Sequence, residues 1–207
     1  RLLPDEGPAV DAFRSIVRDL VAPVLAQLGD PVAGESDLTA KVRGLLLAIL
    51  AIQGNDAASV ERARTIYAAW SADPASVDAE LAAAATGVAA ASGDAEMYAR
   101  FVDVAENGAT PQVQLRHLHL LAEFDDPDLM RRTCEYAMSA KVKSQNAPFL
   151  LRGCIGNRTQ GEIAWRFVRE HWSAANEKFP RNTIVRMVET VKQLDRPEQV
   201  AQSEAFF

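Results

Sequence analysis

The chain is poor in the side chains that metal and nucleophile chemistry require. Its 207 residues include only two cysteines, Cys134 and Cys154, and three histidines. Two cysteines cannot form a disulfide framework and are too few for a structural zinc site, so both are expected to be small core residues. His117 and His119 lie two positions apart, and such a pair points to different sides of a helix and cannot share a metal ion. His171 has no histidine four residues before or after it, so the zinc-protease pattern His-Glu-x-x-His is absent.

Other catalytic patterns are missing as well. Gly153 and Gly156 have neither the lysine nor the preceding strand of a phosphate-binding loop, and they are expected to end a helix. The serines and cysteines have no base close in sequence to activate them, which leaves only a triad assembled from distant residues. Asp125 and Asp126 fit the start of a helix better than an acid and base pair. The sequence therefore predicts no catalytic residue and no metal ligand in this chain.

Positive charge and long apolar runs are also scarce. The chain has 22 Lys and Arg against 28 Asp and Glu, a net charge of −6, which argues against a nucleic-acid partner. The longest apolar stretch, residues 45–52, is far shorter than the roughly 20 residues of a membrane-spanning helix. No signal peptide is recognisable at the N-terminus. These features predict a soluble chain without a membrane partner, and the composition and unpaired cysteines favour the cytoplasm.

What the sequence does contain is helical periodicity, in place of the period-two β-branched runs of a sheet. Two stripes are predicted to be the core-facing sides of the first two helices. Similar stripes recur through the rest of the chain, so the predicted fold class is all-α. The first stripe comprises Phe13, Ile16, Val17 and Leu20, and the second comprises Leu38, Val42, Leu45, Leu46 and Ile49.

Helix starts are evenly spaced along the chain. Asp56, Asp94, Asp126 and Gln160 are read as comparable starts of every second helix, at intervals of 38, 32 and 34 residues. Intervals of this length are typical of stacked antiparallel helical hairpins, an α-solenoid of the HEAT or armadillo kind. A compact helical bundle is the alternative. We predict one helical-repeat domain over residues 1–207, and the start at Arg1 rather than Met favours a fragment of a longer protein.

One region carries a family resemblance. The pattern has three parts in this order: S-Q-x-x-P, then N-x-x-x-G-x-x-A-W-x-F-x-x-x-x-W, then a terminal E-x-F-F. This order resembles the C-terminal helical domain of zinc aminopeptidases of the aminopeptidase N type, the domain named after the endoplasmic-reticulum aminopeptidase. The residues of this pattern are Ser144, Gln145, Pro148, Asn157, Gly161, Ala164, Trp165, Phe167, Trp172, Glu204, Phe206 and Phe207.

The resemblance implies a role within a larger enzyme. In that family the domain is a bowl of helical hairpins, and the zinc-binding catalytic domain lies upstream in the same polypeptide. It implies a non-catalytic module that closes the active-site cavity and contacts the distal end of a peptide, with zinc held upstream rather than here. From the residues alone, Trp165 is expected to pack between hairpins, and Asn157 with Gly161 to shape the turn before its helix.

Three arginines are the candidate substrate-binding residues. Arg116, Arg152 and Arg186 lie within or beside apolar helical stretches, where a guanidinium needs an acidic partner or a water-filled cavity. Arg152 is the first choice, because it directly follows the apolar run 149–151 and no acidic residue lies three or four positions from it. Snorkelling to solvent or pairing with a neighbouring hairpin is its alternative interpretation. Two other functions stay open for the chain: an independent helical-repeat scaffold that binds a protein on its concave face, and a stand-alone enzyme.

Overall fold

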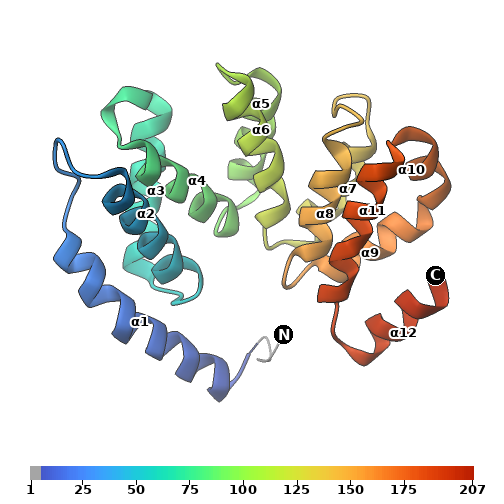
Figure 1. Ribbon diagram of the computed structural model, residues 1–207, viewed down its shortest axis with the longest axis horizontal. Coiled ribbons are helices and arrows are strands. Elements are labelled where there is room, and N and C mark those ends of the chain that lie inside the picture. Colours follow the sequence, from blue (N-terminus) through green and yellow to red (C-terminus); the bar gives the residue numbers. More distant parts are fainter. Residues whose placement is uncertain (1–5) are drawn as a thin grey trace. The chain divides into compact units, whose positions relative to one another are not determined.

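The computed structural model describes residues 6–207, and all of the regular secondary structure in this range is helical (Figure 1). The prediction of an all-α fold is confirmed. The helices form two compact units, residues 6–92 and residues 93–207, and each is described by itself. The single domain over residues 1–207 stays a prediction, because this grouping does not test it.

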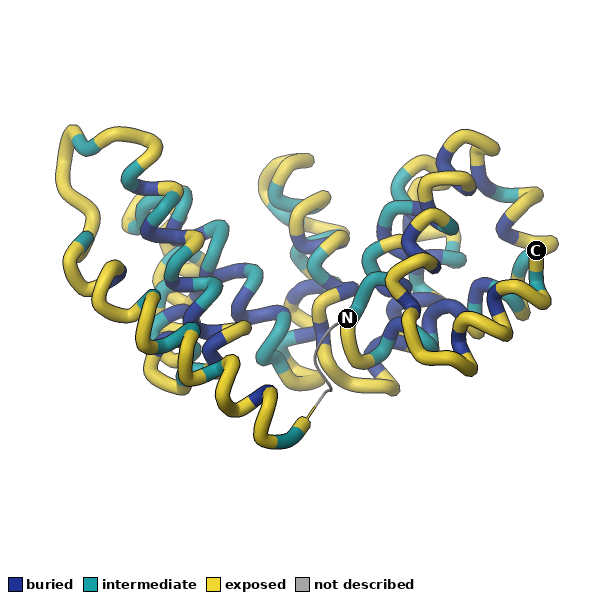
Figure 2. The backbone as a smooth tube through the Cα atoms, turned by 60° about the horizontal axis from the view of Figure 1, so that its bottom comes forward, coloured by how far each residue is buried: buried dark blue, intermediate teal, exposed yellow. Residues whose placement is uncertain are grey.

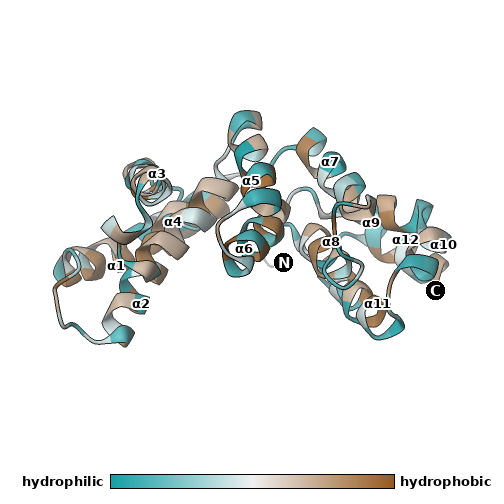
Figure 3. Ribbon diagram, turned by 90° about the horizontal axis from the view of Figure 1, so that it is seen from above, coloured by the Kyte–Doolittle hydropathy of each residue, from teal (hydrophilic) through white to brown (hydrophobic). Residues whose placement is uncertain are grey.

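The first unit is built around its second helix. Helix α2 (Asp37–Ile52) packs against α1 (Pro8–Leu28), α3 (Ala57–Ala72) and α4 (Ala79–Ala91), and a short 3-10 helix, η1 (Pro74–Ser76), connects the last two. Small residues bring α2 and α4 close together. A Cβ atom at Gly44 would lie 2.8 Å from the carbonyl oxygen of Glu80 and 3.4 Å from the Cβ of Ala84. The alanine-rich α4, brown along much of its length in Figure 3, is therefore suited to a tight helix pair.

The first predicted apolar stripe does not face the core. Phe13, Ile16 and Leu20 are 37%, 56% and 67% exposed, so that prediction is wrong. The buried side of α1 instead carries Val10 and Leu25, near its two ends. Figure 2 shows α1 exposed over most of its length. In α2 the second stripe is wrong in part: Leu38 and Leu45 are exposed, and Val42, Leu46 and Ile49 are half-buried. The residues of α2 that are buried are Ala40, Arg43, Gly44, Leu47, Leu50 and Ala51.

The second unit stacks helical hairpins in two layers. One layer contains α6 (Pro111–Leu120), α8 (Ala147–Gly156) and α11 (Arg181–Val188), with α8 in contact with both neighbours. The other contains α7 (Pro127–Met138) and α9 (Gly161–Glu170), which pack against each other and against α8. This stacking is solenoid-like, as predicted. The remaining elements are α5 (Ala95–Asn107), η2 (Leu121–Glu123), α10 (Trp172–Lys178), η3 (Glu189–Gln193) and α12 (Pro197–Phe206).

The four predicted helix starts are confirmed. Asp56, Asp94 and Asp126 precede α3, α5 and α7, and each side chain accepts a hydrogen bond from a backbone amide of the first turn, 2.8 to 2.9 Å away. Gln160 precedes α9 in the same way, without capping through its own side chain. These caps satisfy amides that have no partner within the helix. In the described part of the chain, no helix is both long enough and apolar enough to cross a membrane.

Candidate functional site

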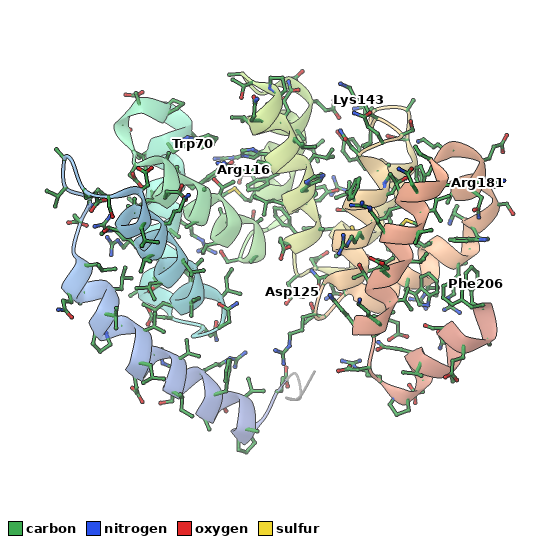
Figure 4. All side chains as sticks on the ribbon, in the orientation of Figure 1. Trp70, Arg116, Asp125, Lys143, Arg181 and Phe206 are labelled. Carbon is green, nitrogen blue, oxygen red and sulfur yellow. The ribbon has the colours of Figure 1, made fainter. Side chains whose placement is uncertain are left out.

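The three candidate arginines lie on three neighbouring helices of one layer. Arg116 belongs to α6 (Figure 4), Arg152 to α8 and Arg186 to α11, and all three side chains are exposed. Since α8 packs directly against α6 and α11, the stacking brings residues from separate parts of the sequence onto one layer of the second unit. The sequence could suggest each arginine separately, but not that they share a layer.

Arg152 is fixed by a contact that the sequence does not reveal. Its Nε donates a hydrogen bond to Oγ1 of Thr190 in η3, at 3.2 Å. Apart from Arg152, every residue of α8 is at least half-buried, so the guanidinium stands out from a helix that packing holds on most sides. This contact uses one of five N–H donors and leaves the two terminal amino groups of the fork for a ligand.

The arginines are not neutralised by neighbouring carboxylates. Within residues 6–207, none of the three guanidinium groups takes part in an ion pair. Apolar side chains accompany them: Leu115 next to Arg116 and Val185 next to Arg186 are exposed, and Phe149 is half-buried one turn before Arg152. We call Arg116, Arg152, Arg186 and these three apolar residues the arginine face. Its chemistry suits a ligand that combines a carboxylate with apolar groups.

The charge of the chain is unevenly distributed between the two units. Residues 93–207 contain 15 Lys and Arg against 16 Asp and Glu, whereas residues 2–92 contain 6 against 12. The net charge of −6 therefore comes mainly from the first unit. The arginine face lies in a nearly neutral unit, where long-range repulsion of an anionic ligand is weak.

The histidines do not form a reactive site. His117 is fully buried, and its ring packs against Phe101 with centroids 4.8 Å apart. Its Nδ1 lies 2.9 Å from the carbonyl oxygen of Val113, and burial lowers its pKa, so the ring is neutral at pH 7. His119 is exposed on another side of α6, as the spacing predicted. Among the described residues, no group of three or more His, Cys, Asp or Glu side chains could hold a metal ion.

The other catalytic candidates are occupied by structural contacts. Cys134 and Cys154 are free thiols with no exposed surface, and burial raises the pKa of Cys154 well above its ordinary value. Their complete burial confirms both cysteines as core residues, and a buried thiol with a raised pKa, such as Cys154, is a poor nucleophile. Asp126 caps α7, and Asp125 accepts hydrogen bonds from the side chains of Thr159 and Gln160. The two aspartates are therefore not a catalytic pair.

The polar residues of the sequence motif build the turn before α9. The side-chain oxygen of Asn157 accepts from the amides of Thr159 and Gln160, and its amide group donates to the carbonyl of Ala122, at 2.9 Å. Gly161 packs so tightly that a Cβ atom there would lie 2.3 Å from the carbonyl oxygen of Ile155. Both residues shape the turn, as expected. The link to Ala122 also attaches this turn to η2.

The aromatic residues of the motif form one cluster. Trp165 is 1% exposed and contacts Phe206 edge to face and Phe207 face to face, at centroid distances of 5.2 and 6.0 Å. Trp172 contacts Phe206 at 5.2 Å. The two tryptophans lie on separate helices, because α9 ends at Glu170 and α10 begins at Trp172. The aromatic residues of the motif therefore have a packing role, and the candidate ligand-binding residues are the three arginines.

Comparison with known proteins gives consistent matches over the chain. The sequence model of one family, described as the ERAP1-like C-terminal domain, matches residues 1–207. The chain is 28% identical to Aminopeptidase M1-A of Oryza sativa subsp. japonica over 201 residues, 94% of this chain and 23% of that protein. It is 31% identical to Aminopeptidase M1 of Arabidopsis thaliana over 150 residues, 69% of this chain and 16% of that protein. The chain therefore spans less than a quarter of the length of either relative.

Proposed function

The chain belongs to the family of ERAP1-like C-terminal domains, and on this basis we propose that it is the non-catalytic C-terminal domain of a zinc aminopeptidase. In this role it closes the active-site cavity and contacts the distal end of the peptide substrate. The names of the relatives support the parent activity, and their much greater length leaves room for a separate catalytic domain.

The proposal also states which part of the polypeptide holds the zinc ligands. A catalytic zinc needs about three protein ligands and an open position for water or substrate. Residues 6–207 offer no such group. The proposal therefore assigns zinc to the remainder of the polypeptide. The partners of the chain are then the catalytic domain of the same polypeptide and the peptide substrate.

The observation that carries the substrate-binding part is the arginine face. Three guanidinium groups that form no ion pair with residues 6–207 lie on neighbouring helices of one layer, and each has an apolar residue close to it in sequence. A guanidinium fork binds a carboxylate through two parallel hydrogen bonds, and the apolar neighbours can receive side chains close to a peptide C-terminus. In the proposal, a basic side chain of this face contacts the terminal carboxylate: Arg152 is the first choice, and Arg116 and Arg186 are the other candidates.

The proposed compartment is the cytoplasm. The two cysteines are free thiols in the structure, and unpaired cysteines are typical of proteins kept in a reducing environment. The alanine- and arginine-rich composition supports the same assignment. Fractionation of the source cells, followed by detection of the parent polypeptide outside the soluble cytoplasmic fraction, would contradict it.

The first test reads the open reading frame that contains this chain. The proposal expects His-Glu-x-x-His upstream, with a further glutamate about twenty residues later, because these residues supply the three zinc ligands and the general base. A complete frame without this pattern would refute the enzyme assignment and favour an independent scaffold that binds a protein partner.

The second test compares substrates in the parent enzyme. Changing Arg152, Arg116 or Arg186 to alanine should raise KM about tenfold for a peptide with a free C-terminus, since a hydrogen bond to a charged group contributes about 1.5–3 kcal/mol. The same peptide with an amidated C-terminus should be nearly unaffected. Arg131→Ala is the matched control, because Arg131 pairs with Asp128 on α7. If every variant keeps the wild-type preference between the two peptides, the arginine face does not bind the carboxylate.

A further inference from the structure

The layer that carries the arginine face contains basic residues and no acidic ones. Helices α6, α8 and α11 together hold four arginines and not one Asp, Glu or Lys. The arginines are Arg116, Arg152, Arg181 and Arg186, and all four are exposed. The chain as a whole has more acidic than basic residues, 28 against 22, so the charge of these helices is opposite in sign to that of the chain.

The other layer of the same unit has a mixed charge. Helices α7 and α9 carry four acidic and four basic residues, and on α7 Arg131 pairs with Asp128. Among these five helices, acidic side chains are therefore confined to the layer that does not carry the arginine face. Positive charges that are gathered without counter-charges repel one another, and an anionic ligand relieves this repulsion.

Two of the arginines lie next to the same residue, Thr190. The helix continues without a break from α11 into η3, and residues four apart in such a run lie on one side, so Arg186 lies beside Thr190. From α8, the Nε of Arg152 donates its hydrogen bond to Oγ1 of Thr190, at 3.2 Å. Helix α8 packs against both α11 and η3, which keeps these elements together. The stacking therefore makes neighbours of Arg152 and Arg186.

No carboxylate of α8, α11 or η3 neutralises this pair of arginines. The one acidic residue in these three elements is Glu189, which is exposed three positions after Arg186 and forms no ion pair with either arginine. Thr190 brings a hydroxyl group and no charge. The terminal amino groups of both guanidinium forks are therefore available to a ligand, and each fork can bind one carboxylate.

We infer that Arg152 and Arg186 together bind a peptide end that carries two carboxylates, so that the substrate class of this face is peptides with Asp or Glu at their last two positions. The inference rests on the proposed function and deepens it, because the terminal carboxylate is one of the two groups and an acidic side chain is the other. A side chain on the last two residues is the nearest second carboxylate that a peptide end can offer to neighbouring arginines.

Four peptides that differ only at the C-terminal end test this substrate class in the parent polypeptide. Two end in Glu-Glu and two in the isosteric Gln-Gln, and each sequence is prepared with a free and with an amidated C-terminus. For both kinds of terminus, the wild type should have a KM about fivefold lower for Glu-Glu than for Gln-Gln, because a carboxylate forms charge-assisted hydrogen bonds with a guanidinium fork. The two Gln-Gln peptides report on the terminal carboxylate alone.

The test variant is Arg186→Gln, which removes a charge at an exposed position and leaves the helix intact. It should bring the KM ratio of the Gln-Gln and Glu-Glu peptides close to one. The matched control is Arg181→Gln, because Arg181 is an exposed arginine of the same helix (Figure 4) but lies about two and a half turns before Thr190, on the opposite side. The control removes the same charge and should keep the wild-type ratio. Far-UV circular dichroism verifies that both variants are folded.

Two results would overturn the inference. One is an equal wild-type KM for the Glu-Glu and Gln-Gln peptides, and a remaining preference for the free C-terminus would then leave the proposed function standing. The other is an equal loss of the ratio in Arg186→Gln and Arg181→Gln, because the ratio would then depend on net charge and not on Arg186. If the wild-type parent hydrolyses none of the four peptides, the proposed function fails and the inference fails with it, so the two failures give different results.

Discussion

The indole ring of Trp165 stands edge to face against the ring of Phe206, with their centroids 5.2 Å apart. Trp165 belongs to α9 and Phe206 to α12, and α10, α11 and η3 lie between them in the sequence. Two hydrogen bonds support the same pairing of helices: Arg169 donates to Gln202 and Gln199 donates to Glu162, at 2.8 and 3.2 Å. The last helix is therefore attached to the second unit mainly through side chains.

Removal of the Trp165 ring should cost much of the stability of the chain. Trp165→Ala empties a fully buried aromatic position, and we expect the free energy of unfolding to fall by about 3–5 kcal/mol, measured by urea denaturation. Phe207→Ala is the control, because Phe207 contacts the same ring but is 73% exposed. A loss below about 1 kcal/mol for Trp165→Ala would contradict its role as a packing residue.

Two glycine substitutions should change stability in opposite directions. A Cβ atom at Gly161 would lie 2.3 Å from a carbonyl oxygen, so Gly161→Ala should destabilise the chain by about 1–3 kcal/mol. A Cβ atom at Gly87, inside α4, would meet nothing within 4 Å, so Gly87→Ala should stabilise it by about 0.5–1 kcal/mol. Thermal unfolding of both variants measures the difference. No loss of stability in Gly161→Ala would show that the turn before α9 adjusts freely, and destabilisation by Gly87→Ala would contradict the open space beside Gly87.

Low pH should weaken the ion pair between Arg43 of α2 and Glu35, which lies in the loop between α1 and α2. The hydrogen bonds from Arg43 hold the pKa of Glu35 below its ordinary value. A carboxyl with a lower pKa in the folded state adds stability above its unfolded pKa of about 4.3, and this contribution is lost as the pH falls through the folded pKa. The wild type should therefore be more stable than Glu35→Gln at pH 7, and the difference should vanish in strong acid.

Denaturant unfolding across a pH series measures this difference. Glu96→Gln is the control, because Glu96 forms an exposed pair with Arg100 within α5, and such pairs contribute little at any pH. A difference in the free energy of unfolding between wild type and Glu35→Gln that stays constant from pH 7 down to strong acid would contradict this prediction. It would mean that the charge of Glu35 does not stabilise its contact with Arg43.

Metal and activity assays on the 207-residue chain should both be negative. After incubation with zinc and dialysis, we expect far less than one equivalent of bound metal, since the described residues offer no ligand group. The chain should also release no product from aminoacyl-nitroanilide substrates. Turnover that follows the chain through purification and resists chelators would support the stand-alone enzyme instead.

Local features of the fold could be predicted from the sequence, because they depend on interactions within one helical turn. Capping at Asp56, Asp94 and Asp126 is of this kind, and all three residues begin helices where expected. Non-local features could not be predicted. The periodicity of Phe13, Ile16 and Leu20 identifies an amphipathic helix, but it does not say which surface covers the apolar side, and within this chain none of the three is buried.

The candidate site likewise combines features that the sequence predicts with contacts that depend on the fold. From the sequence, Arg152 is selected because it directly follows the apolar run 149–151 and has no acidic residue three or four positions away. Its partner Thr190 comes from η3, which the stacking of α8 against α11 and η3 brings next to it. A single threonine in an ordinary helical sequence gives no sign of such a contact. The polar contacts of Asn157 are recognisable from its place before Gly161, but its bond to Ala122 again depends on the fold.

Helix α8 is enclosed by α6, α7, α9 and α11, and this enclosure limits how the sequence can change in length. Insertion of one residue into α8 would rotate the residues after the insertion by about 100° about the helix axis. Buried side chains of α8 would then point to solvent, and exposed ones such as Arg152 would point into the core. Related sequences should therefore align without gaps across residues 147–156. The connection before it, residues 139–146, lies outside regular helix, so a change in its length does not alter the register of α8.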